Sequence, residues 1–236
     1  MTVARILVIT AHPDDVDFGA AGTIAGWTEA GIPVTYCVVT DGDGGGFDPT
    51  APRDQIPIIR RAEQEAAARE VGVTDVRFLG YPDGAVTVTP ELRRDLSRVI
   101  RQVRPQRVVT HSPERNWENI YASHPDHLAV GEAAACAVYP DARNPFQFPE
   151  LLADEGLADH IVGEMWLLGG PSPNHFSDVT DTYERKLAAL QRHISQMTDP
   201  AGGAPANLHA RLRANAERAG LPEDRLAEAF QVVVVP

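Results

Sequence analysis

The first 140 residues alternate short apolar runs with longer helical stretches, and this alternation constrains the fold more than any other feature of the chain. Runs rich in valine, isoleucine and leucine occupy residues 4–10, 34–40, 76–79 and 107–110. Continuous apolar runs of this length, bounded by proline or glycine, are typical of strands buried on both faces of a parallel sheet. Helices are predicted after them at residues 18–30, 58–71, 91–103 and 124–138.

Four strand–helix alternations predict an α/β fold, a Rossmann-like three-layer sandwich with a mostly parallel sheet and helices on both faces. The last third predicts a strand at 164–168, helices at 182–197 and 208–219, and a short strand at 230–235. Residues 141–163, rich in proline and aspartate, give no clear pattern. Nothing resembling a linker interrupts the chain, so we expect one domain spanning residues 1–236, long enough for a substantial core.

The charge balance excludes some classes of partner. There are 33 acidic and 21 basic residues, a formal net charge of -12. Such a surface repels nucleic acid and anionic membranes, and no apolar run is long enough to cross a bilayer, so neither partner is expected. The first strand is followed at once by polar residues, which is unlike a signal peptide and indicates a cytoplasmic protein. A homo-oligomer remains open.

The two cysteines, Cys37 and Cys136, do not form a Cys-x-x-Cys pair. Cys37 falls in an apolar run and Cys136 in an alanine-rich helical stretch. We therefore expect two buried free thiols and a reducing compartment.

Polar clusters follow three of the four predicted strands. The first strand ends at Ala11-His-Pro-Asp-Asp15 and the second at Asp41-Gly-Asp43. The fourth ends at His111, whose long loop leads to His124-Pro-Asp-His127. Because ligands of open α/β sheets bind beyond the carboxyl ends of the strands, these clusters are expected to converge at one edge.

Imidazole and carboxylate groups suit zinc, and a catalytic zinc takes three protein ligands and one water. The side chains of the adjacent residues Asp14 and Asp15 should diverge, so that one binds the metal while the other faces the metal-bound water. That second carboxylate would accept the water's proton. Taken alone, Asp-Asp after a strand is most often a helix N-cap with a solvated neighbour, and His-x-x-His is usually a pair of solvent-facing residues. Their expected convergence favours a metal site.

The sequence resembles the LmbE-like, or PIG-L, family of zinc-dependent N-deacetylases. The two motifs at 11–15 and 124–127, in this order, are the specific part of the resemblance. Supporting matches extend it over residues 4–197: Gly22-Thr23, Thr40-Asp-Gly42, Arg60-x-x-Glu63, Val71-Gly-Val73, Phe78-Leu79, Asp83-Gly84, Lys186 and His193-x-Ser-Gln196.

The resemblance implies that His12, Asp15 and His127 hold one zinc ion per chain, or another divalent metal such as Fe²⁺. Asp14 would be the general base and later the acid, and His124 would stabilise the oxyanion. A further residue, Asp126, would orient a histidine ligand, and its charge would also favour a helix N-terminus.

The resemblance is less specific about substrate contacts. Arg60 would reach the substrate, or else pair with a glutamate on a solvated helix. The side chain of Asp83 would bind sugar hydroxyls, or else belong to an ordinary turn. Asp43 would line the pocket, with glycine neighbours that allow close backbone approach. Two residues, Lys186 and His193, would support the site, although a histidine there is more often a satisfied helix residue.

Some relatives carry a tyrosine at the position of Ala122, where it assists the oxyanion; here Tyr121 precedes that position and is the candidate for the role. The loop 112–123 is a candidate lid or sugar platform through Trp117, for which a place in the core is the commoner outcome.

The function predicted from the resemblance is removal of an acetyl group from a small N-acetylglucosamine-type substrate by metal-activated water. Two alternatives stay open: an amidase of thiol-sugar (mycothiol-type) conjugates, and a non-catalytic sugar- or nucleotide-binding Rossmann-like module. The second predicts a glycine-rich turn directly after the first strand, where this chain has His-Pro-Asp-Asp. The part of the substrate attached to the sugar is expected to be selected by the loops 44–56 and 141–163.

Overall fold

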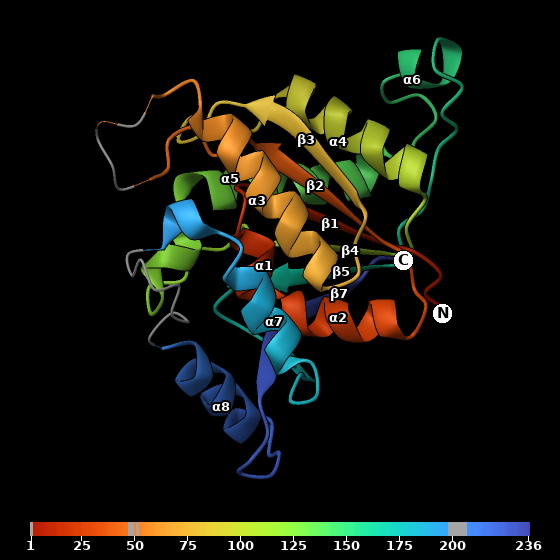
Figure 1. Ribbon diagram of the computed structural model, residues 1–236. Helices are drawn as coiled ribbons and strands as arrows, with labels where there is room; N and C mark the ends of the chain where they lie inside the picture. The colour runs from red at the N-terminus through yellow and green to blue at the C-terminus, as the bar shows by residue number, and fades with distance from the viewer. Residues whose placement is uncertain (1, 47–49, 51, 198–206) are drawn as a thin grey trace.

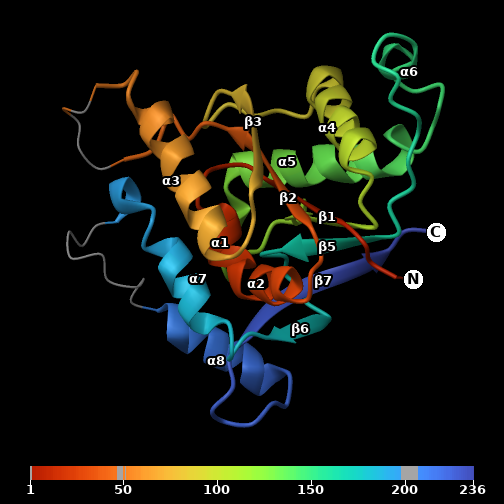
Figure 2. The same cartoon turned by 45° about the vertical axis from the view of Figure 1, so that its right-hand side comes forward.

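The computed structural model describes residues 2–46, 50, 52–197 and 207–236. Seven strands form one sheet in the order β3-β2-β1-β4-β5-β7-β6, with helices on both faces (Figures 1 and 2). The predicted three-layer α/β fold is therefore confirmed. The strands are β1 (Ile6–Thr10), β2 (Val34–Thr40), β3 (Asp75–Tyr81), β4 (Arg107–His111), β5 (Glu164–Leu168), β6 (His175–Asp178) and β7 (Ala227–Val234).

The principal helices are α1 (Asp15–Gly19), α2 (Ala21–Glu29), α3 (Ile56–Glu70), α4 (Pro90–Val103), α5 (Pro125–Cys136), α6 (Glu150–Ala153), α7 (Tyr183–Leu190) and α8 (Leu208–Arg218). Short helical turns cover Ile120–Ser123, Ala137–Asp141 and Ile194–Gln196. None of the helices in the described part of the chain is long and apolar enough to cross a membrane.

Strand order places the candidate site. The strand β1 lies between β2 and β4 and pairs in parallel with both. The order therefore reverses at β1, and the crevice beyond the carboxyl ends of β1 and β4 is the switch point where open α/β sheets bind ligands. The strand β7 runs antiparallel to β5 and β6, so its first residues lie at this same edge.

Alternate residues of the buried strands face opposite layers, which explains why the strand sequences are apolar throughout. On one face Leu7 and Ile9 pack with residues of α4 and α5. On the other face Ile6 and Val8 pack with residues of α2, α3 and α7. A smaller apolar cluster, which includes Leu212, joins α8 to α7.

The structure differs from the sequence-based expectations at several points. The helix expected at 18–30 is two helices, because the backbone leaves helical geometry at Ala20 (φ -141°). This break exposes the first N–H groups of α2 to Glu228, which accepts hydrogen bonds from Gly22 and Thr23. The helix expected at 182–197 ends at Leu190. The half-exposed strand β6 was not expected at all, since its four residues carry little apolar pattern.

The two cysteines differ in burial. Cys37 is buried in the sheet, as predicted. Cys136 is only half-buried and lies 3.7 Å from Glu132, so the prediction of a second buried thiol is wrong. It occupies the end of α5, where one side of the helix meets solvent.

Candidate metal centre

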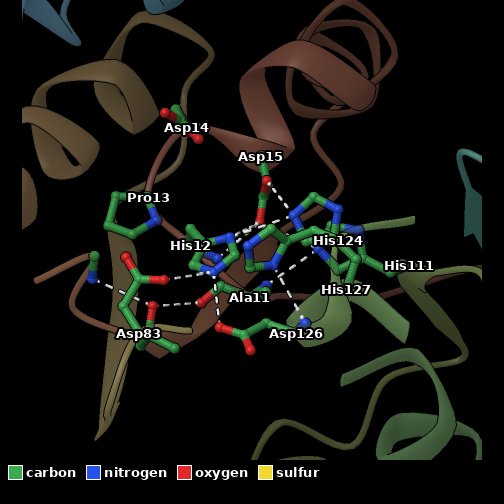
Figure 3. Close-up of polar contacts among 12 residues, drawn as sticks. Ala11, His12, Pro13, Asp14, Asp15, Asp83, His111, His124, Asp126 and His127 are labelled. Atoms are coloured by element: carbon green, nitrogen blue, oxygen red, sulfur yellow. Dashed lines mark hydrogen bonds and ion pairs between the residues drawn. The ribbon is translucent and has the colours of Figure 1, made fainter. Parts of the chain in front are cut away.

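The three predicted metal ligands lie together at the switch point (Figure 3). Nε2 of His127 lies 3.0 Å from an oxygen of Asp15 and 3.3 Å from Nδ1 of His12. Nδ1 of His12 lies 3.4 Å from the other oxygen of Asp15. In a tetrahedral zinc site with bonds of about 2.0–2.1 Å, ligand atoms are about 3.3 Å apart. The residues present therefore fit a single divalent ion.

The second nitrogen of each histidine has its own partner, which leaves the first nitrogen free for a metal. Nε2 of His12 lies 3.0 Å from Oδ2 of Asp126 and 3.0 Å from Oδ1 of Asp83. Nδ1 of His127 lies 3.4 Å from the carbonyl oxygen of Ala122. Such contacts fix the tautomer and the ring orientation of metal-binding histidines.

The fully buried Asp126 also connects two segments remote in sequence. Its carboxylate accepts hydrogen bonds from the backbone N–H groups of Gly84 (2.7 Å) and Val86 (3.1 Å). It lies in the first turn of α5, where a negative charge also favours the helix dipole. Asp126 therefore holds the turn after β3 against both α5 and His12.

His111 was expected at the end of a strand, with no predicted role in the site. Its ring stacks on that of His127, with centroids 4.1 Å apart and planes at 5°. Its Nε2 accepts the N–H of Ala11 at 3.1 Å and lies 3.2 Å from Asp15. Burial, with the nearby His127, lowers the pKa of His111 to about 4, so the ring is neutral. The sequence signal that could have assigned His111 to the site is its position at the carboxyl end of a buried strand.

The side chain of Asp14 lies apart from the contacts among Asp15 and the histidines, as expected for adjacent aspartates whose side chains diverge (Figure 3). Its backbone has a left-handed conformation, φ 92°, which is unusual for a residue other than glycine. Oδ2 accepts a hydrogen bond from Arg60 at 3.1 Å. Burial and the Asp15 charge raise the pKa of Asp14 to about 6, although Arg60 opposes this shift.

The interpretation of Arg60 as a solvated helix residue is wrong. Its side chain is buried and donates to the carbonyl oxygens of Pro13 (2.6 Å) and Gly42 (3.0 Å). A Cβ atom at Gly42, whose φ is +65°, would lie 2.3 Å from the guanidinium. The absence of a side chain at Gly42 thus lets the Arg60 guanidinium lie against the loop backbone. The sequence suggested such a close approach but did not identify Arg60 as the group involved.

A chain of buried polar groups supports the backbone of Asp14. Its N–H donates to Gln64 at 2.8 Å, and the amide of Gln64 donates to Asp17 at 2.9 Å. Nε2 of His193 lies 2.8 Å from the same Asp17 oxygen. His193 follows α7 and does not belong to a helix. Neither Gln64 nor Asp17 was predicted as a site residue. The sequence signal for Gln64 is its spacing of four residues from Arg60, which places both on one face of the same helix.

The acidic groups of the site favour a cation. The histidines His127 and His111 outweigh burial and hold the pKa of Asp15 well below its usual range. Burial disfavours a charge on His12, but Asp15 and Asp83 outweigh it and raise the pKa of His12 to about 11. A positive charge placed among these carboxylates is therefore strongly stabilised.

The remaining predicted residues are divided between the site and its rim. Nδ1 of His124 accepts the N–H of Asp126 at 3.2 Å, and its ring centroid lies 4.9 Å from that of His12. Tyr121, 88% exposed, lies on the loop that borders the cleft described below. Trp117 is 79% exposed, so the expectation of a core position is wrong.

Asp83 and Asp43 lock two loops together. The N–H of Asp83 donates to Oδ1 of Asp43 at 2.9 Å, and Oδ2 of Asp83 accepts the N–H of Gly44 at 3.1 Å. Since Oδ1 of Asp83 already contacts His12, Asp83 is more than an ordinary turn residue.

A cleft of about 830 Å³ opens beside the candidate metal centre, within the size range of small-molecule sites. One end is lined by Asp15, His111 and His127, and the walls come from the loop 116–122, the end of β5 and α8. None of the residues 141–163 lines it, contrary to the expectation that this loop selects the substrate. Of the other loop expected to do so, residues 47–49 and 51 lie outside the described part.

The fold and the site define a class of protein: an α/β sheet whose switch point carries a histidine–aspartate centre suited to a metal-dependent hydrolase. The chain belongs to the PIG-L family, whose model, described as GlcNAc-PI de-N-acetylase, matches residues 7–138.

Named relatives of this chain are deacetylases, that is, amide hydrolases acting on N-acetyl groups. The chain is 33% identical to diacetylchitobiose deacetylase of Thermococcus kodakarensis, over 84% of this chain and 72% of that protein. It is 34% identical to a probable N-acetyl-α-D-glucosaminyl L-malate deacetylase 2 of Bacillus anthracis, over 81% of each. The solved N,N'-diacetylchitobiose deacetylase of Pyrococcus horikoshii superposes with a TM-score of 0.89 at 31% identity, covering 98% of this chain and 84% of that one.

Proposed function

We propose that this chain hydrolyses the acetamide of a small N-acetylglucosamine-type sugar, with a zinc ion held by His12, Asp15 and His127. The observation that carries the proposal is the set of separations between these three side chains, 3.0 to 3.4 Å, beside a cleft. Membership of a family of de-N-acetylases supports the reaction. The glucosaminyl group in the name of the Bacillus relative supports the sugar.

The bound ion would supply Lewis acidity and lower the pKa of a water molecule towards neutrality. Asp14 is the base that accepts the proton and later delivers it to the leaving amine. A pKa of about 6 suits this role, because such a carboxylate is mostly ionised near pH 7 and still holds a proton long enough to pass it on. Arg60 orients the Asp14 carboxylate through the 3.1 Å hydrogen bond.

His124 donates a hydrogen bond to the oxyanion that forms on the acetyl carbonyl. Its Nδ1 is occupied as an acceptor, so a neutral ring carries its proton on Nε2. Burial, with the nearby His12 and His127, lowers the pKa of His124 and favours this neutral form. A neutral imidazole N–H is an effective oxyanion donor. Tyr121, at the cleft border, is proposed to assist it.

Asp43, Asp83 and Arg60 were predicted to contact the substrate, and we propose that they do so only with the polar atoms left over from their contacts within the site. All three are held by contacts within the site, so they shape the pocket and position His12 and Asp14 while presenting remaining polar atoms to the sugar. The thiol-sugar amidase alternative uses the same amide chemistry with a different acyl group. The membership of a family of de-N-acetylases argues against the non-catalytic module.

The test combines metal analysis with acetate release. The purified chain should contain about one equivalent of zinc or Fe²⁺, and should release acetate from N-acetylglucosaminides while leaving the sugar amide of thiol-sugar conjugates intact. Dipicolinate should abolish the activity, and added zinc should restore it. Less than a tenth of an equivalent of metal, with no acetate release after zinc is added, would overturn the proposal. Hydrolysis of the conjugates alone would favour the amidase.

A further inference from the structure

The cleft has two chemically different ends. The end at the metal centre is lined by the Asp15 carboxylate, whereas the far end is lined by Arg211, Asn215 and Arg218 of α8. These three residues are four and three positions apart, which places them on one face of the helix. The helix α8 packs against β7 and β6 at the edge of the sheet (Figure 2).

Arg211 connects the far end of the cleft to the metal centre. Its Nη2 donates to the carbonyl oxygen of Phe18 at 2.9 Å, and Phe18 lies on α1, the short helix that begins at Asp15. A guanidinium has five N–H donors, so this one bond leaves others available to a ligand.

Arg218 lies about two turns further along the same face of α8. Its guanidinium lies over the ring of Phe176, 5.5 Å from the centroid, which restricts the side chain without neutralising it. Neither Arg211 nor Arg218 forms an ion pair with a carboxylate among residues 2–46, 50, 52–197 and 207–236.

One carboxylate of the cleft wall, Glu228, already has a cationic partner. Glu228 lies 2.6 Å from Nζ of Lys186 and accepts the N–H groups of Gly22 and Thr23. The other acidic residue at this part of the lining, Glu118, is exposed. Glu228 also acts electrostatically on Arg211, but its charge is shared with Lys186. In a chain with 33 acidic and 21 basic residues, two arginines outside any ion pair of the described residues therefore give this wall of the cleft positive charge.

We propose that the substrate carries an anionic group, a carboxylate or phosphate, on the part attached to the sugar, and that Arg211 and Arg218 bind it. The planar guanidinium matches the oxygens of both groups with paired hydrogen bonds. The opposite charges of the two ends orient the substrate, with the acetamide toward Asp15 and the anion toward α8. This inference rests on the proposed function for the position of the acetamide.

The test compares three glycosides of N-acetylglucosamine that differ only in the attached group: methyl, carboxymethyl and 2-phosphoethyl. The wild-type kcat/KM should be at least tenfold higher for one or both charged glycosides than for the methyl glycoside, and the larger of the two identifies the anion. R218Q should remove most of this advantage through KM and leave the methyl glycoside within about twofold. R211Q should lower the ratio of charged to methyl kcat/KM likewise, whatever the loss of its bond to Phe18 does to both substrates. The matched control is R213Q, since Arg213 is exposed on α8 and does not line the cleft.

A second measurement does not depend on turnover. Calorimetric titration with the corresponding glucosamine glycosides, which have no acetyl group to lose, should show tighter binding of a charged glycoside to wild type and R213Q than to R218Q. The difference should shrink as salt is raised. Equal binding of charged and methyl glycosides would overturn the inference, even if all three acetylated forms are hydrolysed. Hydrolysis of none, with charge-selective binding retained, would overturn the proposed function and leave the anion site standing.

Discussion

Oδ2 of Asp126 lies 3.0 Å from Nε2 of His12, although 114 positions separate the two residues in the sequence. This contact turns Nδ1 of His12 toward Asp15 and His127, the two other predicted ligands. Because Asp126 also accepts two backbone N–H groups after β3, one buried carboxylate joins three segments around the candidate metal centre.

Replacement of Asp126 by asparagine should weaken metal binding about 10- to 100-fold, the range typical of residues that orient a metal ligand. The backbone N–H groups of Gly84 and Val86 bond different oxygens of Asp126, so asparagine keeps an acceptor for only one of them and also loses the charge that faces His12. Zinc affinity measured by competition with a chromogenic chelator tests this. Asp224→Asn, at an exposed position, serves as the control. Unchanged zinc affinity in a folded D126N variant would contradict the positioning role.

Asp14→Asn should keep the metal but lose activity by about two orders of magnitude or more, because an amide cannot accept the proton. Asp15→Asn should instead weaken metal binding. The comparison requires zinc content and acetate release for both variants. If D14N hydrolyses the substrate at the wild-type rate, Asp14 is not the general base.

Lys186→Met should destabilise the fold by about 3–5 kcal/mol, because it leaves the buried Glu228 without its cation. The double variant K186M/E228Q should recover part of this loss, since the uncompensated charge is removed. Denaturant unfolding of both variants provides the measurement.

The matched control for this pair is the exposed ion pair of Arg192 and Glu70, where Arg192→Met should cost no more than about 1 kcal/mol. Equal costs for K186M and R192M would show that burial of the Lys186–Glu228 pair has no energetic consequence.

Titration of His160 should make the protein less stable in mild acid than at neutral pH. Burial lowers the pKa of His160 below its ordinary value of 6.5, although its ring contacts the carbonyl oxygen of Pro105 at 2.7 Å. As pH falls below 6.5, the unfolded chain binds a proton at this residue before the folded chain does, so the free energy of unfolding decreases.

His160→Gln retains a hydrogen-bond donor but cannot titrate. Between pH 7 and about 5 it should therefore lose less stability than wild type, measured as the difference in the free energy of unfolding at each pH. A parallel loss in both proteins would show that His160 does not contribute to the acid sensitivity.

The sequence alone determined the parallel strands of the sheet and approximately where they end, although it gave no signal for β6. Buried strands such as residues 6–10 need apolar side chains on both faces, and this requirement is visible locally. The motifs containing His12 and His127 follow or lie near those strand ends, so their meeting was predictable from topology. The family could also be inferred from these motifs, and the comparisons confirm it.

Only the tertiary structure decided which other groups support or extend the site. His111, Gln64 and Asp17 gave weak signals, because each acts through a partner that lies close in space and far along the chain. The exposure of Trp117 was likewise undetermined, since a tryptophan suits either a core or a rim. Placement of α8 beside the cleft depends on apolar contacts of Leu212 with elements near α7, which no local pattern specifies. For that physical reason the sequence indicated the chemistry at the ends of the strands, whereas packing between distant segments determined the shape and charge of the cleft.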